Sequence, residues 1–472
     1  MTGLIGRNKE KAQLLKAFES DKSEFVVVYG RRRVGKTFLI REVFDYKFLF
    51  QHAGIAGGSM KEQLAAWSVS MTRAGSDSKA PKNWLEAFSQ LGKLIDSSPE
   101  GKKVIFIDEM PWIDTLHSRF QQALEFFWNS WASSRRDVLL IVCGSATSWI
   151  INNVVHSHGG LHNRVTTEIN LEPFTLLECE DMAKSQGLSL TRYQVLETYM
   201  ILGGIPYYWS LLDPALTTDE NIDNLFFSHT GRLRNEFQEL YASLFKKPEK
   251  YVKIVTALSQ KAIGLTRNEI AKTCDEEANG NLTRMLDELE QSRFIRRYNR
   301  YGSLGKNNAI YQLIDNFTLF YFKFIDGKRN LGQYYWSALS NSAVRNVWNG
   351  LSFERVCLDH TAQLKKSLGI SGVLSNEYAW RSGSKEQEKA QIDLILDRRD
   401  KVIDLCEMKF WNDVFTIDKD YDTSLRRKRN AFINQTKTRN SVRIILITTY
   451  GVARNEYSNN VQQCLTIDDL FC

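Results

Sequence analysis

Residues 25–37 hold the glycines and side chains best suited to bind phosphate. A short apolar run ends there in Gly-x-x-x-x-Gly-Lys-Thr, and helical apolar spacing begins at Phe38. Glycines let the backbone curl so that successive N–H groups face phosphate oxygens, and the N-terminus of a following helix attracts the anion. Lys36 would reach the β- and γ-phosphates, and the Thr37 hydroxyl would bind Mg²⁺. Because a strand precedes the loop and a helix follows it, an ATP site is favoured over a turn with a structural lysine, and it would include Gly30, Arg31, Arg32, Arg33, Val34, Gly35, Lys36, Thr37 and Phe38.

A second apolar run, residues 104–107, ends in two acidic residues, Asp108 and Glu109, 71 positions after Thr37. Buried parallel strands read as continuous apolar runs, and ligands lie at their carboxyl ends. We expect Asp108 to hold Mg²⁺ through its water shell and Glu109 to activate the attacking water as general base. Together with the loop, this pair predicts ATP hydrolysis.

The last third of the chain contains another set of residues able to bind a metal ion. Residues 391–396 and 402–409 read as strands, and the 13 residues between Asp393 and Glu407 allow a tight hairpin. Side chains alternate along a strand, so Glu407 and Lys409 share a face. Two carboxylates can bind Mg²⁺ and lower the pKa of its water, while the lysine orients the nucleophile. The set predicts a phosphodiesterase site, with charged residues that merely flank strands as the alternative.

The overall composition limits the elements that can position these residues. A chain of 472 residues is too long for one core, and about two to four domains are expected. No apolar run reaches the roughly 18–20 residues that span a bilayer, and the polar N-terminus argues against a signal peptide. The seven cysteines form no Cys-x-x-Cys pair, which favours reduced thiols in a cytoplasm over disulfides or a zinc site. The net charge of +7 is compatible with nucleic-acid binding but too small to demonstrate it.

The middle of the chain reads as short helices followed by a β-hairpin. Thr266 and Glu269 have the spacing of a capping box, and residues 281–289 show helical apolar spacing. Residues 294–298 and 309–313 would form the hairpin. This order looks like a winged helix, a module that binds DNA or serves as a plain protein contact. The basic residues that could bind phosphates are Arg284, Arg293, Arg296, Arg297, Arg300 and Lys306.

The N-terminal third resembles the AAA+ ATPases. Their sensor is a polar residue at the tip of the strand beside the acidic pair, and Ser145 matches it, although asparagine is commoner there. The resemblance implies that Gly6 and Arg7 lie against the adenine, with a loop before an ordinary helix as the alternative. It also implies that Arg164, just before the last strand, stabilises charge on the γ-phosphate of a neighbouring subunit, with a surface arginine as the alternative. Such an arginine requires a ring or at least a dimer.

Two further resemblances cover the rest of the chain. The Gly-x-Pro segment within residues 202–208 is similar to the helical lid of the signalling-ATPase branch, with Arg232 or Arg234 as a second sensor. The D…E-x-K pattern is similar to the nuclease core shared by restriction endonucleases and archaeal Holliday-junction resolvases. That resemblance implies a helix-borne acid at Glu354, and Gln391 fits a Gln-x-Asp variant.

The chain as a whole resembles archaeal and bacterial AAA-type ATPases with a C-terminal nuclease-like domain. The predicted fold is α/β, with an AAA+ P-loop ATPase core (1–175), a helical lid (176–245), a winged helix (246–315) and a restriction-endonuclease-like domain (316–472). The expected metal ligands are Thr37, Asp108, Asp393 and Glu407. The expected function is ATP hydrolysis coupled to an Mg²⁺-dependent nuclease-like domain that acts on DNA. The protein is expected to form a homo-oligomer and not to associate with a membrane. The alternative is a signalling or remodelling ATPase whose C-terminal half is a non-catalytic partner-binding module.

Overall fold

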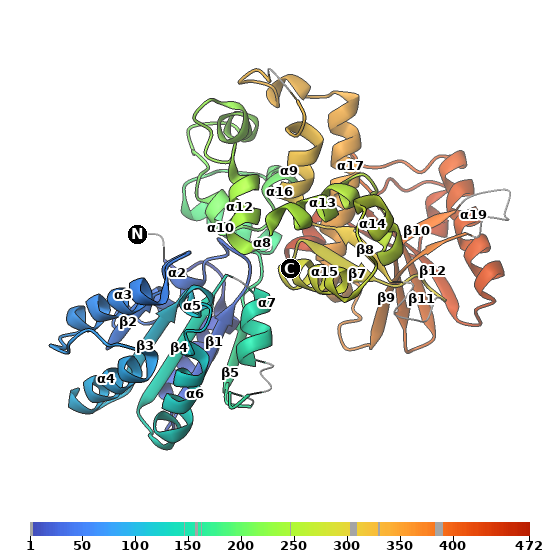
Figure 1. Ribbon diagram of the computed structural model, residues 1–472. Coiled ribbons are helices and arrows are strands. Elements are labelled where there is room, and N and C mark those ends of the chain that lie inside the picture. Colours follow the sequence, from blue (N-terminus) through green and yellow to red (C-terminus); the bar gives the residue numbers. More distant parts are fainter. Residues whose placement is uncertain are drawn as a thin grey trace. The chain divides into compact units, whose positions relative to one another are not determined.

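The computed structural model describes residues 3–145, 147–155, 159–161, 163–245, 247–302, 309–328, 331–382 and 390–472. The chain divides into two compact units, Met1–Pro173 and Phe174–Cys472, and Figure 1 shows them in blue to teal and in green to red. Each unit is described by itself. The predicted division into four domains is finer than these two units and stays a prediction.

Unit 1 is built on a five-stranded parallel sheet with the strand order β2-β3-β4-β1-β5. Every residue of β1, β3 and β4 is buried, which explains why these strands read as unbroken apolar runs. The strands are β1 (Glu24–Tyr29), β2 (Phe50–Ala53), β3 (Lys103–Asp108), β4 (Val138–Gly144) and β5 (Thr167–Asn170). The helices are α1 (Asn8–Glu19), α2 (Lys36–Val43), α3 (Met60–Arg73), α4 (Trp84–Ser97), α5 (Met110–Ile113), α6 (Phe120–Ser130), the 3-10 turn η1 (Ala132–Ser134), α7 (Thr147–Ile150) and the π-helix η2 (Ile151–Val155).

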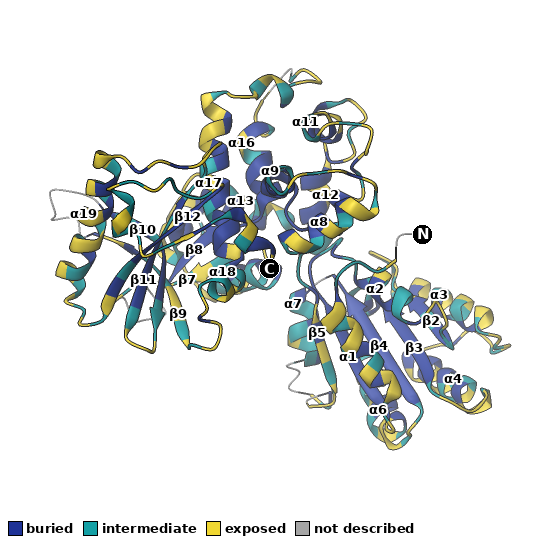
Figure 2. Cartoon of the chain, turned by 180° about the vertical axis from the view of Figure 1, so that it is seen from behind, coloured by how far each residue is buried: buried dark blue, intermediate teal, exposed yellow. Residues whose placement is uncertain are grey.

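An aromatic core joins one face of this sheet to helices α3, α4 and α6. Trp67, Trp84 and Phe120 are fully buried. Trp84 packs edge-to-face against each of the other two rings, with ring centroids 5.5 Å and 4.9 Å apart. Figure 2 shows the dark blue interior of the sheet under partly exposed helices. Such large buried rings stabilise the sheet on which the phosphate loop is mounted.

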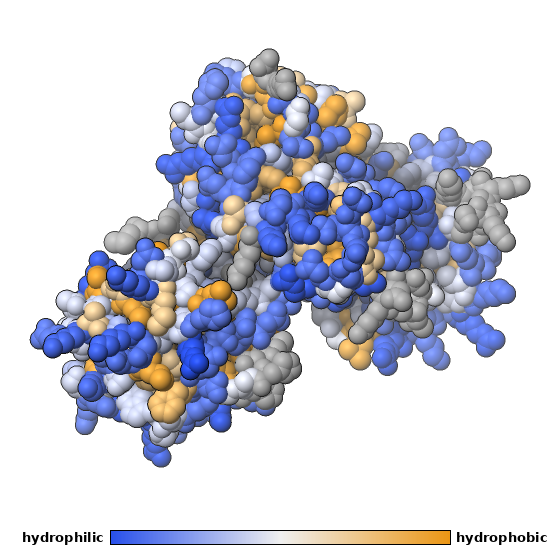
Figure 3. Space-filling view, in the orientation of Figure 1, coloured by the Kyte–Doolittle hydropathy of each residue, from blue (hydrophilic) through white to orange (hydrophobic). Residues whose placement is uncertain are grey.

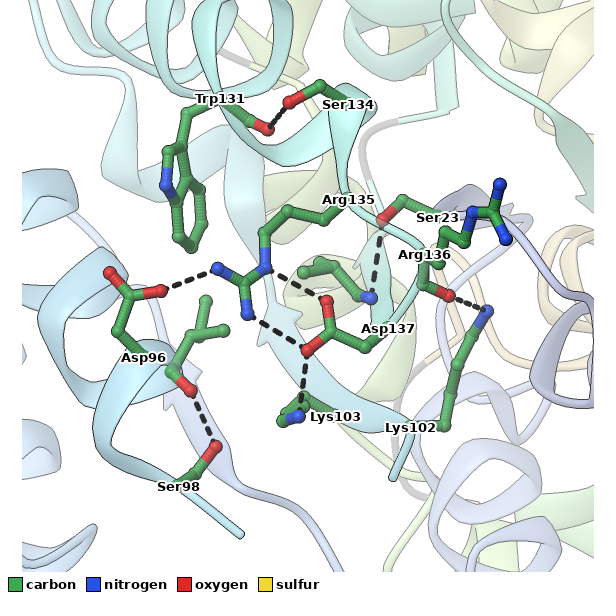
Figure 4. A network of polar contacts seen from close by, with 12 residues as sticks. Ser23, Asp96, Ser98, Lys102, Lys103, Trp131, Ser134, Arg135, Arg136 and Asp137 are labelled. Atoms are coloured by element: carbon green, nitrogen blue, oxygen red, sulfur yellow. Dashed lines mark hydrogen bonds and ion pairs between the residues drawn. The ribbon is translucent and has the colours of Figure 1, made fainter. Parts of the chain in front are cut away.

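An ion-pair network lies at the edge of the sheet where the strands begin (Figure 4). Asp137 accepts hydrogen bonds from Arg135 at 2.8 and 2.9 Å and from Lys103 at 2.7 Å. Hydrogen bonds from these two cations, chiefly Arg135, hold the pKa of Asp137 well below its usual range. Lys102 donates to the carbonyls of Ser20, at 2.8 Å, and of Lys22. The network therefore fixes the edge opposite to the phosphate loop.

Unit 2 begins with a group of helices around the aromatic helix α16. Phe317, Phe320 and Phe324 of α16 are completely buried and form the core of this group. The helices of this group are α8 (Leu176–Ser185), α9 (Arg192–Leu202), α10 (Pro206–Trp209), α11 (Thr218–Ile222), the π-helix η3 (Asp223–Phe227), α12 (Glu236–Leu244), α13 (Pro248–Ser259) and α16 (Asn316–Phe324).

A small three-stranded antiparallel sheet with the order β6-β8-β7 follows α13. The predicted capping box is present at the start of α14, where Thr266 and Glu269 bond reciprocally. The predicted hairpin is also present, formed by β7 and β8. The elements are β6 (Leu265–Thr266), α14 (Arg267–Cys274), α15 (Gly280–Gln291), β7 (Ile295–Tyr298) and β8 (Ile310–Leu313).

A five-stranded mixed sheet with the order β13-β12-β11-β10-β9 completes unit 2. Strands β10 and β11 form the predicted hairpin, and β11, β12 and β13 are parallel. The strands are β9 (Ser375–Arg381), β10 (Gln391–Arg398), β11 (Val402–Lys409), β12 (Ser441–Thr448) and β13 (Gln463–Leu465). The helices and 3-10 turns are η5 (Ser337–Leu339), α17 (Ala343–Asp359), α18 (Thr361–Ser367), α19 (Lys419–Thr436), η6 (Ser458–Asn460) and η7 (Ile467–Phe471).

Within the described ranges, no helix is long and apolar enough to cross a membrane. The face drawn in Figure 3 is hydrophilic over most of its area, and the hydrophobic areas on it are scattered.

Candidate functional site

The predicted phosphate loop connects β1 to α2 and depends on two glycines. Gly30 has φ of 146°, and a Cβ atom there would lie 2.2 Å from the carbonyl oxygen of Leu171. Gly35 has φ of 93° and is the N-cap of α2. Side chains at these positions would be strained, and at Gly30 the side chain would also collide with backbone. The loop therefore curls in front of the α2 N-terminus, as an anion site requires.

The Lys36 side chain is buried inside this loop. Its Nζ donates to the carbonyls of Gly30 at 2.8 Å and Arg31 at 3.0 Å, and lies 3.4 Å from the Ser145 hydroxyl. Burial lowers the pKa of Lys36, and the nearby Glu109 and Asp108 oppose this shift. Phosphate oxygens could exchange with the two neutral carbonyls, because both are hydrogen-bond acceptors for the same ammonium group.

Thr37 and Asp108 meet directly, as a shared Mg²⁺ site requires. The Thr37 hydroxyl donates to Asp108 Oδ2 at 2.8 Å. The other carboxylate oxygen accepts from the Glu109 N–H at 2.9 Å and from the Cys143 thiol at 2.6 Å. Burial raises the pKa of Cys143 strongly, so the thiol keeps the proton that it donates. Sequence reasoning missed Cys143, although it lies on the strand beside β3, two residues before Ser145.

The Glu109 carboxylate is held by Ser145. The Ser145 hydroxyl donates to Glu109 Oε1 at 2.6 Å, and its N–H lies 3.2 Å from Oε2. Glu109 has φ of 46°, which turns the chain at the end of β3. The expected general base, the expected sensor and Lys36 thus form one connected group.

The remaining residues expected at the nucleotide surround this group. Arg7 is buried and donates to the carbonyl of Glu172 at 2.7 Å and, at 3.4 Å, to that of Val34 in the loop. The segment with Gly6 is thereby tied to the loop. Arg31 and Val34 are buried, Arg32 and Arg33 are half-buried, and Phe38 is exposed.

Arg164 lies apart from the loop of its own chain. It is exposed and precedes β5, whose first residue pairs with Val26 near the start of β1. The loop follows the other end of β1, and six strand residues span about 20 Å. Arg164 therefore lies near the end of β1 that is remote from the loop of its own subunit. Arg232 and Arg234, the candidates for a second sensor, lie in unit 2.

The Thr37 and Asp108 pair fits a hydrated Mg²⁺ ion. This ion usually takes one or two protein oxygens, several waters and phosphate oxygens of the substrate. A hydroxyl and a carboxylate oxygen at the mouth of a phosphate loop supply such a donor set.

The second predicted set is brought together in unit 2. Glu354 lies on α17, which packs against β11. The register of β10 and β11, continued by one residue, places Asp393 opposite Glu407. Burial raises the pKa of Glu354 to about 8, and the negative charges of Asp393 and Glu407 add to the shift. The three carboxylates therefore share one neighbourhood.

These carboxylates already have internal partners. Lys428 of α19 lies 2.7 Å from both oxygens of Glu407. The Gln391 amide donates to Asp393 at 2.6 Å. Burial raises the pKa of Glu407, and the Lys428 ammonium opposes the shift. This pairing was not predicted, because the basic residues 426–429 read as a solvated helical face or as a contact for a phosphate backbone.

The geometry of this set does not form a metal site as it stands. Lys409 lies over the rings of Phe415 and Tyr421, whose centroids are each 5.8 Å from its Nζ. Its positive charge also opposes the raised pKa of the nearby Glu407 carboxyl. Among the described residues, no group of three or more His, Cys, Asp or Glu side chains is arranged to hold a metal ion. A cation at Glu407 would have to displace Lys428.

The basic residues of the small antiparallel sheet are partly neutralised. Arg284 pairs with Glu288 at 3.2 Å, and Arg297 lies 3.4 Å from Glu290. Figure 3 shows mainly hydrophilic colours over α14 and α15. Lys306 lies outside the described residues. The candidate recognition helix α15 is therefore of mixed charge.

Comparison with known proteins finds an ATPase family match over unit 1 and the first helices of unit 2. Residues 4–212 match a family described as an ATPase domain predominantly from Archaea. The chain is also similar to the uncharacterized protein MJECL04 of Methanocaldococcus jannaschii. The two are 24% identical over 428 aligned residues, which make up 87% of this chain and 88% of that protein. The chain therefore carries a P-loop ATPase domain and is an ATPase, as predicted.

Two solved structures show partial similarity. The Walker-type ATPase PABY2304 of Pyrococcus abyssi is 16% identical, with 68% of this chain and 96% of that chain covered and a TM-score of 0.48. The ORC2 protein of Aeropyrum pernix, in ADPNP–ADP complexes, is 12% identical, with 68% and 93% covered and a TM-score of 0.43. Similarity at this level carries no conclusion about function.

Proposed function

We propose that unit 1 hydrolyses ATP at the site formed by Lys36, Thr37, Asp108, Glu109 and Ser145. The observation that carries this proposal is the continuous contact from Thr37 to Asp108 and from Lys36 through Ser145 to Glu109. When bound at Thr37 and Asp108, Mg²⁺ would neutralise charge on the phosphates.

The side chains of the site have separate tasks in this proposal. Lys36 binds the β- and γ-phosphate oxygens, and the Glu109 carboxylate takes a proton from the attacking water. Ser145 orients that carboxylate through its hydroxyl and N–H groups. Gly6 and Arg7 place the N-terminal segment beside the loop, where the adenine would lie.

The test is steady-state ATP turnover by the purified chain. Lys36→Ala is expected to abolish turnover, because no other ammonium group lies in the loop. Lys47→Ala is the matched control, since Lys47 is exposed and pairs with Asp45. Undiminished turnover in Lys36→Ala would overturn the assignment of the phosphate loop.

We further propose that Arg164 acts on the nucleotide of a neighbouring subunit in a homo-oligomer. The supporting observation is its exposed position at the sheet edge opposite to its own loop. Subunits with Arg164→Ala and subunits with Glu109→Gln are each expected to be inactive alone. Their mixture should recover part of the activity, because intact sites form between the two kinds of subunit. A mixture without any recovery would refute the trans role.

We also propose that the C-terminal half is a nuclease-like domain acting on DNA, preceded by a helical lid and a winged helix. Support comes from the shared neighbourhood of Glu354, Asp393 and Glu407. The test is Mg²⁺-dependent cleavage of linear, branched and supercoiled DNA by wild type, by Asp393→Ala and, as control, by Asp420→Ala. If neither wild type nor Lys428→Met cleaves, or if Asp393→Ala cleaves as well as wild type, the nuclease proposal fails.

One observation favours the alternative, a signalling or remodelling ATPase with a non-catalytic C-terminal partner module. Both oxygens of Glu407 are held by Lys428, which opposes metal binding. Cleavage by neither wild type nor Lys428→Met would support this alternative. Cleavage by Lys428→Met alone would instead show a nuclease site that the lysine blocks.

A further inference from the structure

A cavity of about 190 Å³ lies inside unit 2, between the small antiparallel sheet and the mixed sheet. Arg296, Tyr298 and Arg300 line it from one side, and Arg355 of α17 and Asp393 of β10 line it from the other. The two sides are joined where the Tyr301 N–H donates to the carbonyl of Ala379 at 2.9 Å. The walls of the cavity are therefore connected by backbone hydrogen bonding within unit 2.

Arg355 is a buried cation that faces this cavity with an unused donor. Only 7% of the solvent-accessible surface of Arg355 is exposed. One guanidinium nitrogen donates to the carbonyl of Leu351 at 3.1 Å, within the same helix. Its Nε finds no hydrogen-bond acceptor among the residues that the structure describes. A buried donor without an acceptor costs free energy, and the cost is larger for a charged group.

Arg296 supplies a second guanidinium group held in a fixed orientation. Its Nε donates to Gln312 at 2.7 Å, and the Gln312 amide in turn donates to the carbonyl of Ala262. Burial lowers the pKa of both guanidinium groups. The carboxyls of Asp359 and Asp393 oppose this shift at both arginines, and Glu354 opposes it at Arg355. Two neighbouring guanidinium groups, one of which has an unused donor, are suited to bind one anion between them even with these carboxyls nearby.

We propose that this cavity binds a phosphate group through Arg296 and Arg355. The guanidinium fork matches phosphate geometry with two parallel hydrogen bonds. Pockets for whole drug-sized ligands are about 300–1,000 Å³, so the smaller cavity admits a phosphate or sugar-phosphate group but no duplex. The source is the 5′-phosphate end of a DNA strand or a free phosphate. The first of these rests on the proposed action on DNA.

The test uses the full chain with Lys36→Ala, so that the ATP loop contributes little to phosphate binding. Three proteins are compared: this parent, the parent with Arg355→Met, and the parent with Arg399→Met. Arg399 is exposed and lies outside the cavity, so its loss changes the net charge equally. The thermal midpoint is measured with inorganic phosphate and with acetate at the same ionic strength. Anisotropy then compares 5′-phosphorylated with 5′-hydroxyl oligothymidylate.

Phosphate should raise the thermal midpoint of the parent and of the Arg399→Met control, and acetate should not. Arg355→Met should weaken phosphate or phosphorylated-strand binding about tenfold or more, the effect of one charge-assisted hydrogen bond. A preference for the 5′-phosphorylated strand assigns the strand end as source, and binding of inorganic phosphate alone assigns the free ion.

Equal phosphate binding in all three proteins, or equal protection by acetate, would overturn the proposal. Arg296→Gln is the second variant should Arg355→Met fail to fold, and it should weaken binding in the same direction. A protein that binds phosphate in the cavity but cleaves no DNA would refute the nuclease proposal and leave the phosphate site in place. Failure of the phosphate proposal and failure of the nuclease proposal are therefore distinguishable.

Discussion

Replacement of Ser145 by alanine tests whether the residue at the tip of β4 contributes to ATP hydrolysis. The change removes one hydroxyl and leaves the backbone in place. The hydroxyl donates to Glu109 Oε1 at 2.6 Å, whereas the N–H, 3.2 Å from Oε2, remains. Lys36 keeps its bonds to two loop carbonyls at 2.8 and 3.0 Å. The expected defect is therefore confined to the position of the general base.

The size of the defect follows from the bond that is lost. A hydrogen bond to a charged group is worth about 1.5–3 kcal/mol. If the whole of this energy positions Glu109 in the transition state, kcat falls about 10- to 150-fold, since each 1.36 kcal/mol is about tenfold in rate. The remaining N–H restrains the carboxylate, so we expect a value near the lower end, with little change in KM for ATP.

The assay is phosphate release at saturating and limiting ATP by wild type, Ser145→Ala and Ser134→Ala. Ser134 is an exposed serine whose hydroxyl donates to the carbonyl of Trp131 at 2.8 Å, so it controls for the loss of a surface hydroxyl. An unchanged kcat in Ser145→Ala, in a preparation where Glu109→Gln is inactive, would refute the positioning role. A raised KM with normal kcat would place Ser145 in ATP binding instead.

Three further perturbations test other parts of the chain. Gly30→Ala should abolish ATP binding, measured by equilibrium dialysis, because the added Cβ lies 2.2 Å from a backbone oxygen, and tight binding by this variant would contradict the loop geometry. Lys428→Met should lower the unfolding free energy by about 1–3 kcal/mol in urea, because Glu407 loses its charged partner. Asp137→Asn should destabilise the protein at neutral pH. A carboxyl whose pKa is lowered by folding stabilises the native state fully above the ordinary pKa of 3.8. The difference from wild type should therefore shrink progressively as the pH falls from that value toward the lower pKa of the folded protein.

Local chemistry allowed much of unit 1 to be predicted from the sequence. Strands β1, β3 and β4 are buried along their whole length, so each is an unbroken apolar run that ends at a functional residue. The capping box of α14 is a contact between residues three apart, which sequence spacing alone specifies. Parallel strands end at one edge, and this brings Thr37 to Asp108 without knowledge of any other contact.

Contacts between distant elements were beyond sequence reasoning. The pairing of Lys428 with Glu407 depends on how α19 lies against the mixed sheet, and the basic stretch around Lys428 reads as a solvated face. Cys143 looks like an ordinary strand residue until the register of β3 and β4 places it at Asp108. Arg355 has no sequence signal at all, because its burial arises from the packing of α17 against β11 and α9.

The phosphate loop and the C-terminal carboxylate set differ in which bound groups a ligand must displace. In the phosphate loop, Lys36 is held by neutral carbonyls, which phosphate oxygens can replace while the ammonium gains charge. In the C-terminal set, a metal ion would have to displace a lysine that neutralises Glu407 at 2.7 Å from both oxygens. Replacing the Lys428 ammonium by a metal ion exchanges one cation for another, whereas phosphate adds a negative charge beside Lys36. The second step is expected to contribute the more favourable binding free energy. The phosphate loop can therefore accept its ligand without losing an ion pair, whereas metal binding at Glu407 requires that Lys428 be released.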